Sequence, residues 1–468
     1  MDIDKKKEIK NQDDTSSYDD SLDAVPSPSK SSFFPFKEVL KSLGPGIITG
    51  AANEDPTTVA AYSQAGARFG FGILWLALLQ YPMLAVFQEM CARIGLVTGG
   101  GLAAAIKYKY PKERKHLVVI LFASLILIAA TINLGADIGA MAASVKLIFP
   151  QLSGIIATLF FTGFIVTAEI LIPYKKYVKI LKYLVVSLFA YVVTAIIVGG
   201  NWTQMLVSSI IPHIEFTPTF VLIFVATFGA TMSPYIFFWQ ASEQAEEGVV
   251  KQKIKEISEY DREKPPRISK KEFSLMRLDI AIGMALSQLI MWSVITTTAV
   301  SLHAHGIIDI QTADQAARVL QPVVSTFPYA GVMAKTIFAL GLIGTGLLAI
   351  PVMAAASAYA LSDALGWRQG LSKKFTQAKK FYAVIATSTI IGLWINFANM
   401  DPIKALVYTA TINGIVAVPI FIAVMKIAND RKILKDKVNG KVSNIIGCIT
   451  IIVMAISVLI MLFTELYR

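Results

Sequence analysis

The sequence predicts an all-α integral membrane protein with eleven transmembrane helices, and three observations indicate this. Of the 468 residues, 55% are apolar and only 16% are charged, whereas about a quarter of the residues of a soluble domain are charged. Eleven apolar stretches come near the roughly 20 residues that a membrane-spanning helix needs. Lysine and arginine gather in alternate connections between these stretches. The surplus apolar surface must therefore face lipid.

The eleven apolar stretches follow one another along most of the chain, several of them interrupted by glycine, proline or one polar residue. They lie near Val39–Phe69, Phe71–Ile94, Leu117–Phe149, Ile155–Ile172, Tyr183–Val198, Phe220–Gln240, Leu278–Leu302, Val332–Leu361, Phe381–Phe397, Ile403–Val424 and Ile445–Phe463. Residues 37–465 are thus expected to form one eleven-helix domain. Residues 1–36 lack an apolar run, so they are expected to be a disordered tail and not a signal peptide.

The charges of the connections predict how the helices are oriented. Connections after even-numbered spans are basic, for example KYKYPKERKH, whereas the others carry little beyond Arg68 and Arg318. Under the positive-inside rule, the N-terminus and the basic connections are cytoplasmic. An odd number of spans then puts the C-terminus outside. We expect the plasma membrane, and specifically a bacterial inner membrane, as the location.

Composition also excludes several classes of protein. The net charge of +11 is spread over short clusters between apolar spans, so the expected partner is the lipid bilayer and not a nucleic acid. Cys91 and Cys448 fall inside spans, where a thiol packs as a small hydrophobe, and neither a disulfide nor a cysteine-based metal site is expected. The sequence shows neither a nucleophile–base pair nor a phosphate-binding loop, so an enzyme is not expected. We expect a monomer without a resident cofactor.

The first span carries charged residues at its centre. The segment GPGIITGAANEDPTTVAAYSQAG places Asn53, Glu54 and Asp55 directly before Pro56. Burying a charged side chain at the centre of the membrane costs about 2.5–3.5 kcal/mol, so such a residue is expected to have a compensating partner or a functional role. Pro56 removes one backbone donor and frees carbonyl groups near Ala52. Free carbonyls beside a carboxylate predict a cation site, and the alternative is a simple proline kink.

The sixth span repeats this device five spans later. In FGATMSPYIFFWQASEQAEE, Pro234 stands in mid-helix behind Gly229 and Ser233. Two interrupted helices at corresponding positions are typical of an inverted-repeat transporter, whose binding site lies between the breaks. The expected repeats are residues 37–200 and 217–428, followed by an extra helix over 443–465. Carbonyl ends of half-helices next to Asp55 favour a cation over an anion.

Other polar residues are weaker candidates. Those inside spans either line a pathway or bridge two helices, and they are Glu89, Asn133, Asp137, Gln288 and Asn413. After the sixth break, an acidic inner vestibule or, as the favoured interpretation, a solvated helix end is expected at Glu243, Glu246 and Glu247. The pair His303 and His305 has metal-site spacing but no acids nearby, which is a weak pattern.

Three segments resemble the NRAMP family of divalent metal transporters. GPGIITGAANEDPTTVAAYSQAGARFGFGILW is similar to the family's first helix and turn, ARIGLVTGGGL to the end of its second helix, and GATMSPY to its sixth-helix break. The resemblance covers residues 37–465. It implies a LeuT-like 5+5 inverted repeat with broken helices 1 and 6.

The two break motifs depart from the family pattern. Where the family has Asp-Pro-Gly-Asn, this chain has Asp55, Pro56, Thr57 and Thr58, and Met-Pro-His is replaced by Ser233, Pro234 and Tyr235. The resemblance implies that the metal meets Asp55, Thr58 and Ser233 and the carbonyls near Ala52 and Ala230, of which only Asp55 is an unchanged match. Further candidates along the pathway or around the ligands are Glu54, Asn53, Tyr235, Asp137, Asn413 and Gln240.

These departures predict the ion and its coupling. Without a sulfur ligand, an all-oxygen site suits Mg²⁺, Ca²⁺ or Mn²⁺. Ser233 is shorter than methionine and leaves room for water, which favours a hydrated Mg²⁺ ion, with Mn²⁺ as a second substrate. Proton-coupled members of the family carry two histidines in the sixth helix and acidic residues in the third. The resemblance places Tyr235 and Gln240 at the histidine positions, and Asn133 and Ala136 at the acidic positions. The chain therefore resembles the NRAMP-related magnesium transporter branch, which implies import by alternating access without proton coupling.

Three alternatives stay open. One is a proton-coupled Mn²⁺ or Fe²⁺ importer, in which Asp137 and Glu89 carry protons. Another is a Na⁺-coupled amino-acid carrier on the same fold, although Glu54 and Asp55 at the break argue against an anionic substrate group. The third is a structural or receptor-like membrane protein, for which the breaks are only kinks.

Overall fold

The structure is a computed structural model that describes residues 44–466, with the exception of 111, 173–188, 190, 251–267, 318–328 and 398–400. By its internal contacts the chain divides into Met1–Ser42 and Leu43–Arg468, and the helices described below belong to the second part. The described residues form helices, turns and loops, and no strand. The predicted tail of residues 1–36 lies outside the described residues, as do 183–188 and 190 of the predicted fifth span, Tyr183–Val198, whereas residues 191–198 of that span are helical.

Two of the predicted spans are divided into half-helices, as the prolines indicate. The first consists of α2 Pro45–Ala52 and α3 Pro56–Phe69, and the sixth of α10 Pro218–Thr231 and α11 Pro234–Val250. The other helices, in chain order, are η1 Gly70–Ile73, α4 Trp75–Thr98, α5 Leu102–Lys109, α6 Lys112–Ile148, α7 Gly154–Leu171, α9 Trp202–Ile210, α12 Lys270–Ser301, η2 His303–His305, α13 Ala313–Ala317, α14 Ala330–Leu365, α15 Lys379–Ile395, α16 Pro402–Ala428, α17 Arg431–Leu434 and α18 Lys441–Leu466.

Fewer helices qualify as spans by length and composition than the eleven predicted from the sequence. In the described part, seven do so, or eight when the pair Pro56–Ile73 and Trp75–Thr98, bent by 110°, counts as one span. The differences have structural reasons. The first span is cut into two short helices, the predicted ninth span is α15 with 17 residues, and the predicted fifth is described only in part, over 189 and 191–198.

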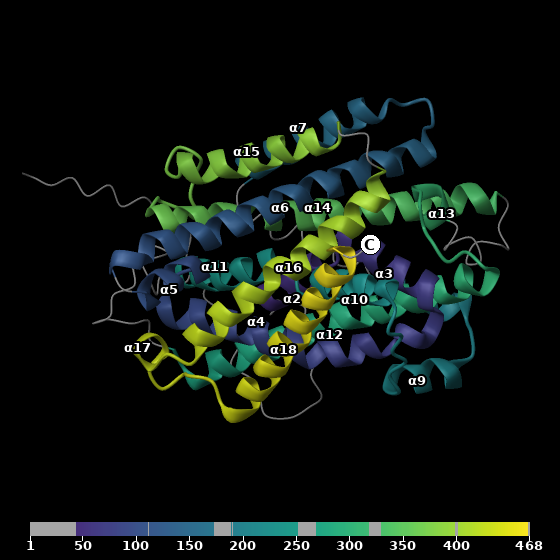
Figure 1. The fold of residues 1–468 in the computed structure, drawn as a ribbon. Coiled ribbons are helices and arrows are strands. Elements are labelled where there is room, and N and C mark those ends of the chain that lie inside the picture. The colour runs from purple at the N-terminus through teal and green to yellow at the C-terminus, as the bar shows by residue number, and fades with distance from the viewer. Residues whose placement is uncertain are drawn as a thin grey trace, which may run out of the picture. The chain divides into compact units, whose positions relative to one another are not determined.

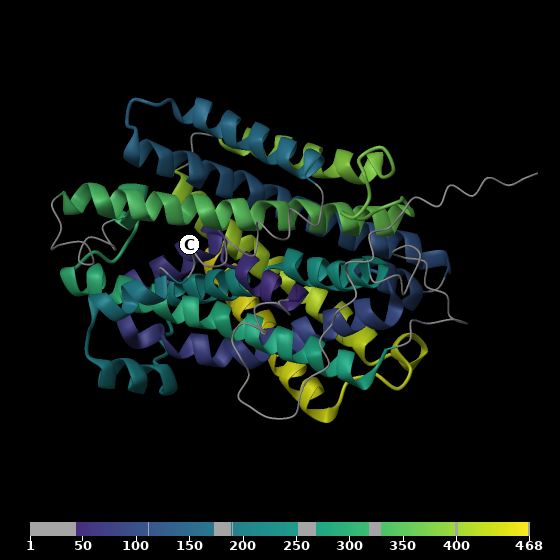
Figure 2. The same ribbon diagram turned by 180° about the vertical axis from the view of Figure 1, so that it is seen from behind.

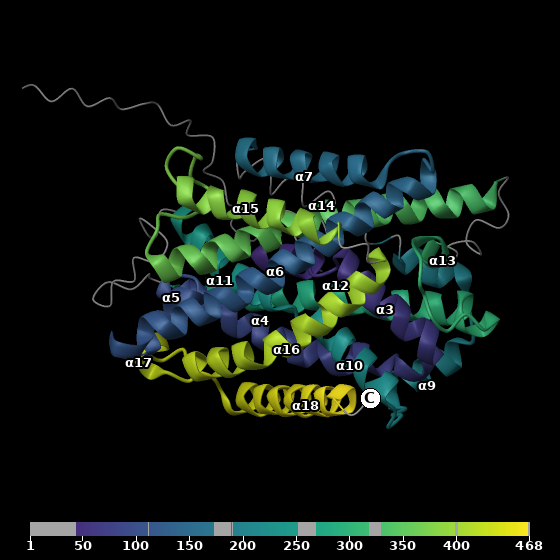
Figure 3. The ribbon, with the colours of Figure 1, turned by 45° about the horizontal axis from the view of Figure 1, so that its top comes forward.

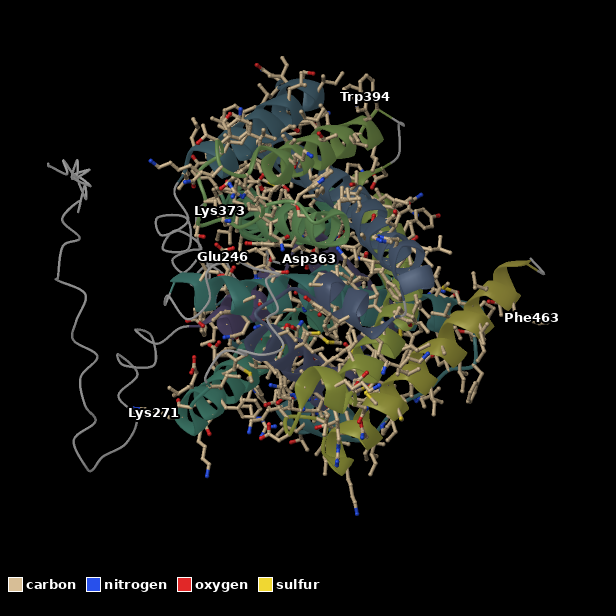
Figure 4. The ribbon with its side chains drawn as sticks, turned by 90° about the vertical axis from the view of Figure 1, so that its left-hand side faces the viewer. Glu246, Lys271, Asp363, Lys373, Trp394 and Phe463 are labelled. Carbon is tan, nitrogen blue, oxygen red and sulfur yellow. The ribbon has the colours of Figure 1, made fainter. Side chains whose placement is uncertain are left out.

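The helices around the two broken spans pack in pairs. Helices α6 and α14 contact each other along their length, and α7 and α15 cover them on one side (Figures 1 and 2). Helix α18 packs on α10 and α16 at another side (Figure 3). Trp394 on α15 and Phe463 on α18 stand at outer edges in Figure 4, and both are exposed. Apolar side chains exposed on these outer helices are what a lipid-facing surface requires.

Glycines bring the half-helices into backbone contact with their neighbours. A Cβ at Gly50 of α2 would collide with the carbonyl of Gly283 in α12, and one at Gly66 of α3 would collide with the same helix at Thr298. A Cβ at Gly229 of α10 would meet the Ala410 carbonyl of α16, whereas a Cβ at Gly95 of α4 would meet the Ala241 carbonyl of α11. Small residues at helix crossings are the usual means of close packing in membranes.

We expect Gly50→Val to destabilise the protein, because the added methyl groups would meet the Gly283 carbonyl. Overpacking of this kind costs about 1–3 kcal/mol. The melting temperature of the purified protein in detergent should therefore fall. Gly163→Val in α7 is the matched control, since a Cβ there meets nothing within 4 Å, and it should leave the melting temperature unchanged. Equal melting temperatures for both variants would contradict the close α2–α12 contact.

Charged side chains also bridge helices in this part of the chain. Glu89 of α4 pairs with Arg93 at 3.0 Å and with Arg277 of α12 at 2.9 Å. Asp279 of α12 accepts the backbone N–H groups of Gly44 and Gly46 at 3.0 and 2.7 Å, so it caps the start of α2. The pairing of Glu89 supports its interpretation as a bridge between helices.

Candidate cation site at the two helix breaks

The first break is built around Asp55, which is the N-cap residue of α3. Its Oδ1 accepts the N–H of Thr58 at 2.6 Å, and Pro56 occupies the first helical position. Both features are typical of a helix start, because the first N–H groups of a helix lack partners within it. Residues 53–55 therefore interrupt the helix, and Asp55 is fixed at the interruption.

The second break presents backbone carbonyls and hydroxyls to the first. The Ser233 hydroxyl donates to the carbonyls of Gly229 and Ala230 at 3.0 and 2.8 Å. The Thr58 hydroxyl reaches the same Ala230 carbonyl from α3, at 3.3 Å. The Asn413 amide of α16 lies 3.5 Å from the Ser233 hydroxyl. The two interrupted helices thus meet at the Ala230 carbonyl.

Tyr235 joins the two breaks in a way that the sequence does not reveal. Its hydroxyl lies 3.1 Å from Asp55 Oδ2 and 3.2 Å from the Ala52 carbonyl. The structure therefore brings together all five predicted ligand residues, Asp55, Thr58, Ser233, Ala52 and Ala230, and each is fully buried. The Tyr235 hydroxyl stands between two of these ligand groups, so a cation that touches both must either displace it or bind it.

Helix α6 supplies polar groups behind Asp55. The Asn133 amide donates to Asp55 Oδ2 at 3.0 Å and lies 3.0 Å from the sulfur of Met353. Asp137 Oδ1 accepts the N–H and the hydroxyl of Thr57 at 3.1 and 2.8 Å. Asp137 is thus adjacent to the α3 start, although its contact is to Thr57 and not to Asp55. Met353 was not predicted, because nothing in the sequence links it to the break, and Thr57 stands in the break motif but was not predicted to contact Asp137.

The side chains of Glu54 and Asn53 face α12, and in the described part they make no hydrogen bond to the five predicted ligand residues. Glu54 Oε1 accepts the Ser287 hydroxyl at 2.6 Å, and the Asn53 amide donates to Ser287 at 3.2 Å and to the Thr231 carbonyl at 3.0 Å. Ser287 was missed, although the adjacent Gln288 was a weak candidate. Gln240 Oε1 accepts the Thr49 hydroxyl at 2.6 Å, which ties α11 to α2.

Several buried oxygens at the breaks have no hydrogen-bond partner in the described part of the chain. They are Asn53 Oδ1, Glu54 Oε2 and Asp137 Oδ2. Buried polar atoms are nearly always paired, so unpaired oxygens indicate room for water or an ion. Across the described ranges, no three side chains of His, Cys, Asp or Glu form a metal-binding group. The site therefore consists of one central carboxylate with hydroxyl and carbonyl oxygens, which are ligands for hard cations.

Among the described residues, no acids join the histidine pair in a metal site. His303 and His305 lie in the short turn η2, both exposed, and His303 Nδ1 lies 2.9 Å from the Ala67 carbonyl. The imidazole of His303 is thus held by backbone. This arrangement agrees with the sequence analysis, in which the spacing of His303 and His305 was only a weak indication of a metal site.

Known proteins resemble this chain over nearly its whole length. A curated relative is the divalent metal cation transporter MntH of Pectobacterium carotovorum subsp. carotovorum (strain PC1), 24% identical over 438 residues, with 92% of this chain and 95% of the relative covered. The crystal structure of a manganese transporter of Eremococcus coleocola, in complex with an aromatic bis-isothiourea substituted compound, matches with a TM-score of 0.67 and 16% identity, covering 93% of this chain and 88% of that one.

A second solved structure extends the comparison of folds. Mhp1, a nucleobase-cation-symport-1 family transporter in a closed conformation, matches with a TM-score of 0.54 and 13% identity, over 83% of this chain and 78% of that one. These similarities confirm the predicted LeuT-like fold of a multi-pass membrane protein. Residues 46–464 match the family described as Nramp, natural resistance-associated macrophage protein-like. Because this match spans most of the sequence, the chain belongs to the Nramp family.

Proposed function

We propose that this chain carries divalent metal cations across the membrane. The observation that supports this most directly is Asp55, a fully buried carboxylate between two interrupted helices, with the carbonyls of Ala52 and Ala230 and the hydroxyls of Thr58 and Ser233 around it. A carboxylate with carbonyl ends of half-helices suits a cation. The MntH relative and the manganese transporter of Eremococcus coleocola agree with this class of cargo.

Mg²⁺ is the proposed principal ion, with Mn²⁺ as a second substrate. Every proposed ligand is an oxygen, because Ser233 stands where the family has methionine. Mg²⁺ is usually held through one or two carboxylates while it keeps several waters. The unpaired oxygens of Glu54 and Asp137 lie at the same break and are suitable acceptors for such waters.

Transport would proceed by alternating access, driven by the inside-negative potential and without a proton. Tyr235 and Gln240 occupy the places of the two sixth-helix histidines, and Gln240 cannot titrate. One observation favours the proton-coupled alternative: Asp137 is buried next to the break with Oδ2 unpaired in the described part. Glu89, the other proposed proton carrier, is held by two arginines.

Uptake into liposomes tests cargo and coupling together. We expect the purified protein to import Mg²⁺ and Mn²⁺ in preference to Ca²⁺ and Cd²⁺ when a potential is imposed. An enclosed pH dye should report no acidification, because no proton follows the metal. Metal-dependent acidification would establish the proton-coupled alternative. In that case Asp137→Asn should abolish the acidification.

Location and assembly are part of the same proposal. We infer a monomer in the bacterial inner membrane, with the N-terminus and the basic connections in the cytoplasm and the C-terminus outside. The basic helix ends support this orientation, since Lys107 and Lys109 end α5 and Arg431 and Lys432 lie in α17 on the same side of the helix array (Figure 1).

A further inference from the structure

Two of the three glutamates after the sixth break are buried, which corrects the interpretation of this segment as a solvated helix end. Glu243 is 2% exposed and Glu246 is fully buried, whereas Glu247 is partly exposed. All three belong to the C-terminal part of α11. Figure 4 looks onto this end and shows Glu246 near Asp363, the latter from the last turn of α14. A buried carboxylate requires compensation.

Glu246 has this compensation. It accepts the Tyr359 hydroxyl at 2.7 Å and the backbone N–H groups of Leu371 and Ser372 at 3.2 and 2.8 Å. It therefore fastens the connection between α14 and α15 to α11. Asp363 acts similarly, because it accepts the Ala104 N–H and the Gln369 amide. Both carboxylates have a structural purpose.

Glu243 differs from Glu246 because one of its carboxylate oxygens is unpaired. Its Oε2 is buried and has no hydrogen-bond partner among the described residues. Glu246 and Glu247 are its acidic neighbours along the helix, so the local field is negative. A carboxylate in this position is stabilised when a cation comes next to it.

The position of Glu243 relates it to the site at the breaks. Tyr235, Trp239 and Glu243 are four residues apart and lie on one face of α11. Tyr235 touches Asp55, and Glu243 follows about 12 Å further along the helix axis. Between them, Trp239 packs edge-on against Tyr359 at 6.4 Å between ring centroids, and both rings are buried. The order along this face is thus ligand site, aromatic barrier and free carboxylate.

We propose that Glu243 is a second cation-binding residue, which receives the divalent ion after it leaves Asp55 and before it reaches the cytoplasm. This inference rests on the proposed function. The ion would arrive with part of its water shell and exchange water for Glu243 Oε2. In this structure Trp239, packed against Tyr359, lies between Tyr235 and Glu243 along α11, and Glu246 holds the connection between α14 and α15 against α11.

Transport measured from both sides of the membrane tests the proposal. Mn²⁺ uptake is followed in cells and in inside-out vesicles from the same cells, which present the cytoplasmic face to the added Mn²⁺. For Glu243→Gln we expect the half-saturating Mn²⁺ concentration to rise about tenfold in the vesicles and to stay unchanged in cells. Glu247→Gln is the matched control, since Glu247 is a partly exposed glutamate one turn away, and it should behave as wild type on both sides.

The outcomes separate this inference from the function on which it rests. Wild-type affinity on both sides for Glu243→Gln, or an equal change on both sides, would overturn the role of Glu243 while metal transport stands. If the wild-type protein moves no divalent ion, the proposed function itself fails. Should the glutamine variant not reach the membrane, Glu243→Asp provides the same comparison, because it keeps the charge and draws it back toward the helix. Its affinity should again fall on the cytoplasmic face only.

Discussion

Asp55→Asn should reduce divalent cation uptake by at least about a hundredfold, because altering only residues around metal ligands already costs 10–100-fold. Asparagine is the informative replacement. It caps a helix as well as aspartate does, so the Thr58 N–H keeps an acceptor and the start of α3 is preserved. The charge at the break is lost, together with one acceptor, because the new Nδ2 cannot accept the Asn133 amide as Asp55 Oδ2 does. Uptake of Mn²⁺ into liposomes and the melting temperature in detergent are the two measurements.

The matched control is another N-cap aspartate. Asp401 accepts the N–H groups of Ile403 and Lys404 at the start of α16. Asp401→Asn should leave uptake unchanged, since it makes the same chemical change away from the breaks. Wild-type uptake by Asp55→Asn would remove Asp55 from the ligand set, and equal losses in both variants would indicate a general structural effect.

Ser233→Met should shift selectivity toward Cd²⁺ and Mn²⁺ and away from Mg²⁺, by about tenfold or more in the ratio of uptake rates. A thioether prefers softer metals and cannot accept the hydrogen bonds of a hydrated Mg²⁺ ion as a hydroxyl does. Ser233 lies in the break after α10, and in the described part of the chain its hydroxyl bonds to the carbonyls of Gly229 and Ala230 and to the Asn413 amide, so few bonds are lost. Competition between Mg²⁺ and Cd²⁺ in liposomes measures the ratio.

Ser144→Met controls for the size of the new side chain. Ser144 is a buried serine that donates to the Ala140 carbonyl four residues back in α6, as Ser233 in the break donates to the Gly229 carbonyl four residues back in α10. This variant should change stability without changing the Cd²⁺ to Mg²⁺ ratio. An unchanged ratio for Ser233→Met itself would exclude Ser233 as a ligand.

The breaks could be predicted because proline acts locally. Pro56 and Pro234 each remove a backbone donor, and the structure places helix starts at both residues. The position of Asp55 follows equally from the sequence, since aspartate before proline is a favoured helix start. The family resemblance then supplied the fold, which the solved structures confirm.

Contacts between distant segments could not be predicted in this way. Whether Tyr235 points to Asp55 depends on how α11 is rotated after its break, and residue spacing alone does not determine that rotation. From the sequence, Glu246 was interpreted as solvated. Its partners, the amides of Leu371 and Ser372, follow more than a hundred residues later, and the sequence does not show that they come next to it. Asp279 escaped notice for the same reason, since it caps a helix more than two hundred residues upstream.

The glycine contacts impose an asymmetry on how the broken helices can move. Both halves of the first span are fitted against one helix, α12, through Gly50 and Gly66. The halves of the sixth span rest on different helices, α10 on α16 and α11 on α4. Separating α2 from α3 would therefore have to bend α12 or open one of these contacts. Separating α10 from α11 leaves their glycine contacts closed only if α16 moves away from α4, on which it packs through Phe421 and Phe87. The two halves of the first span are therefore expected to move together with α12, whereas the two halves of the sixth span are expected to move with α16 and with α4, respectively.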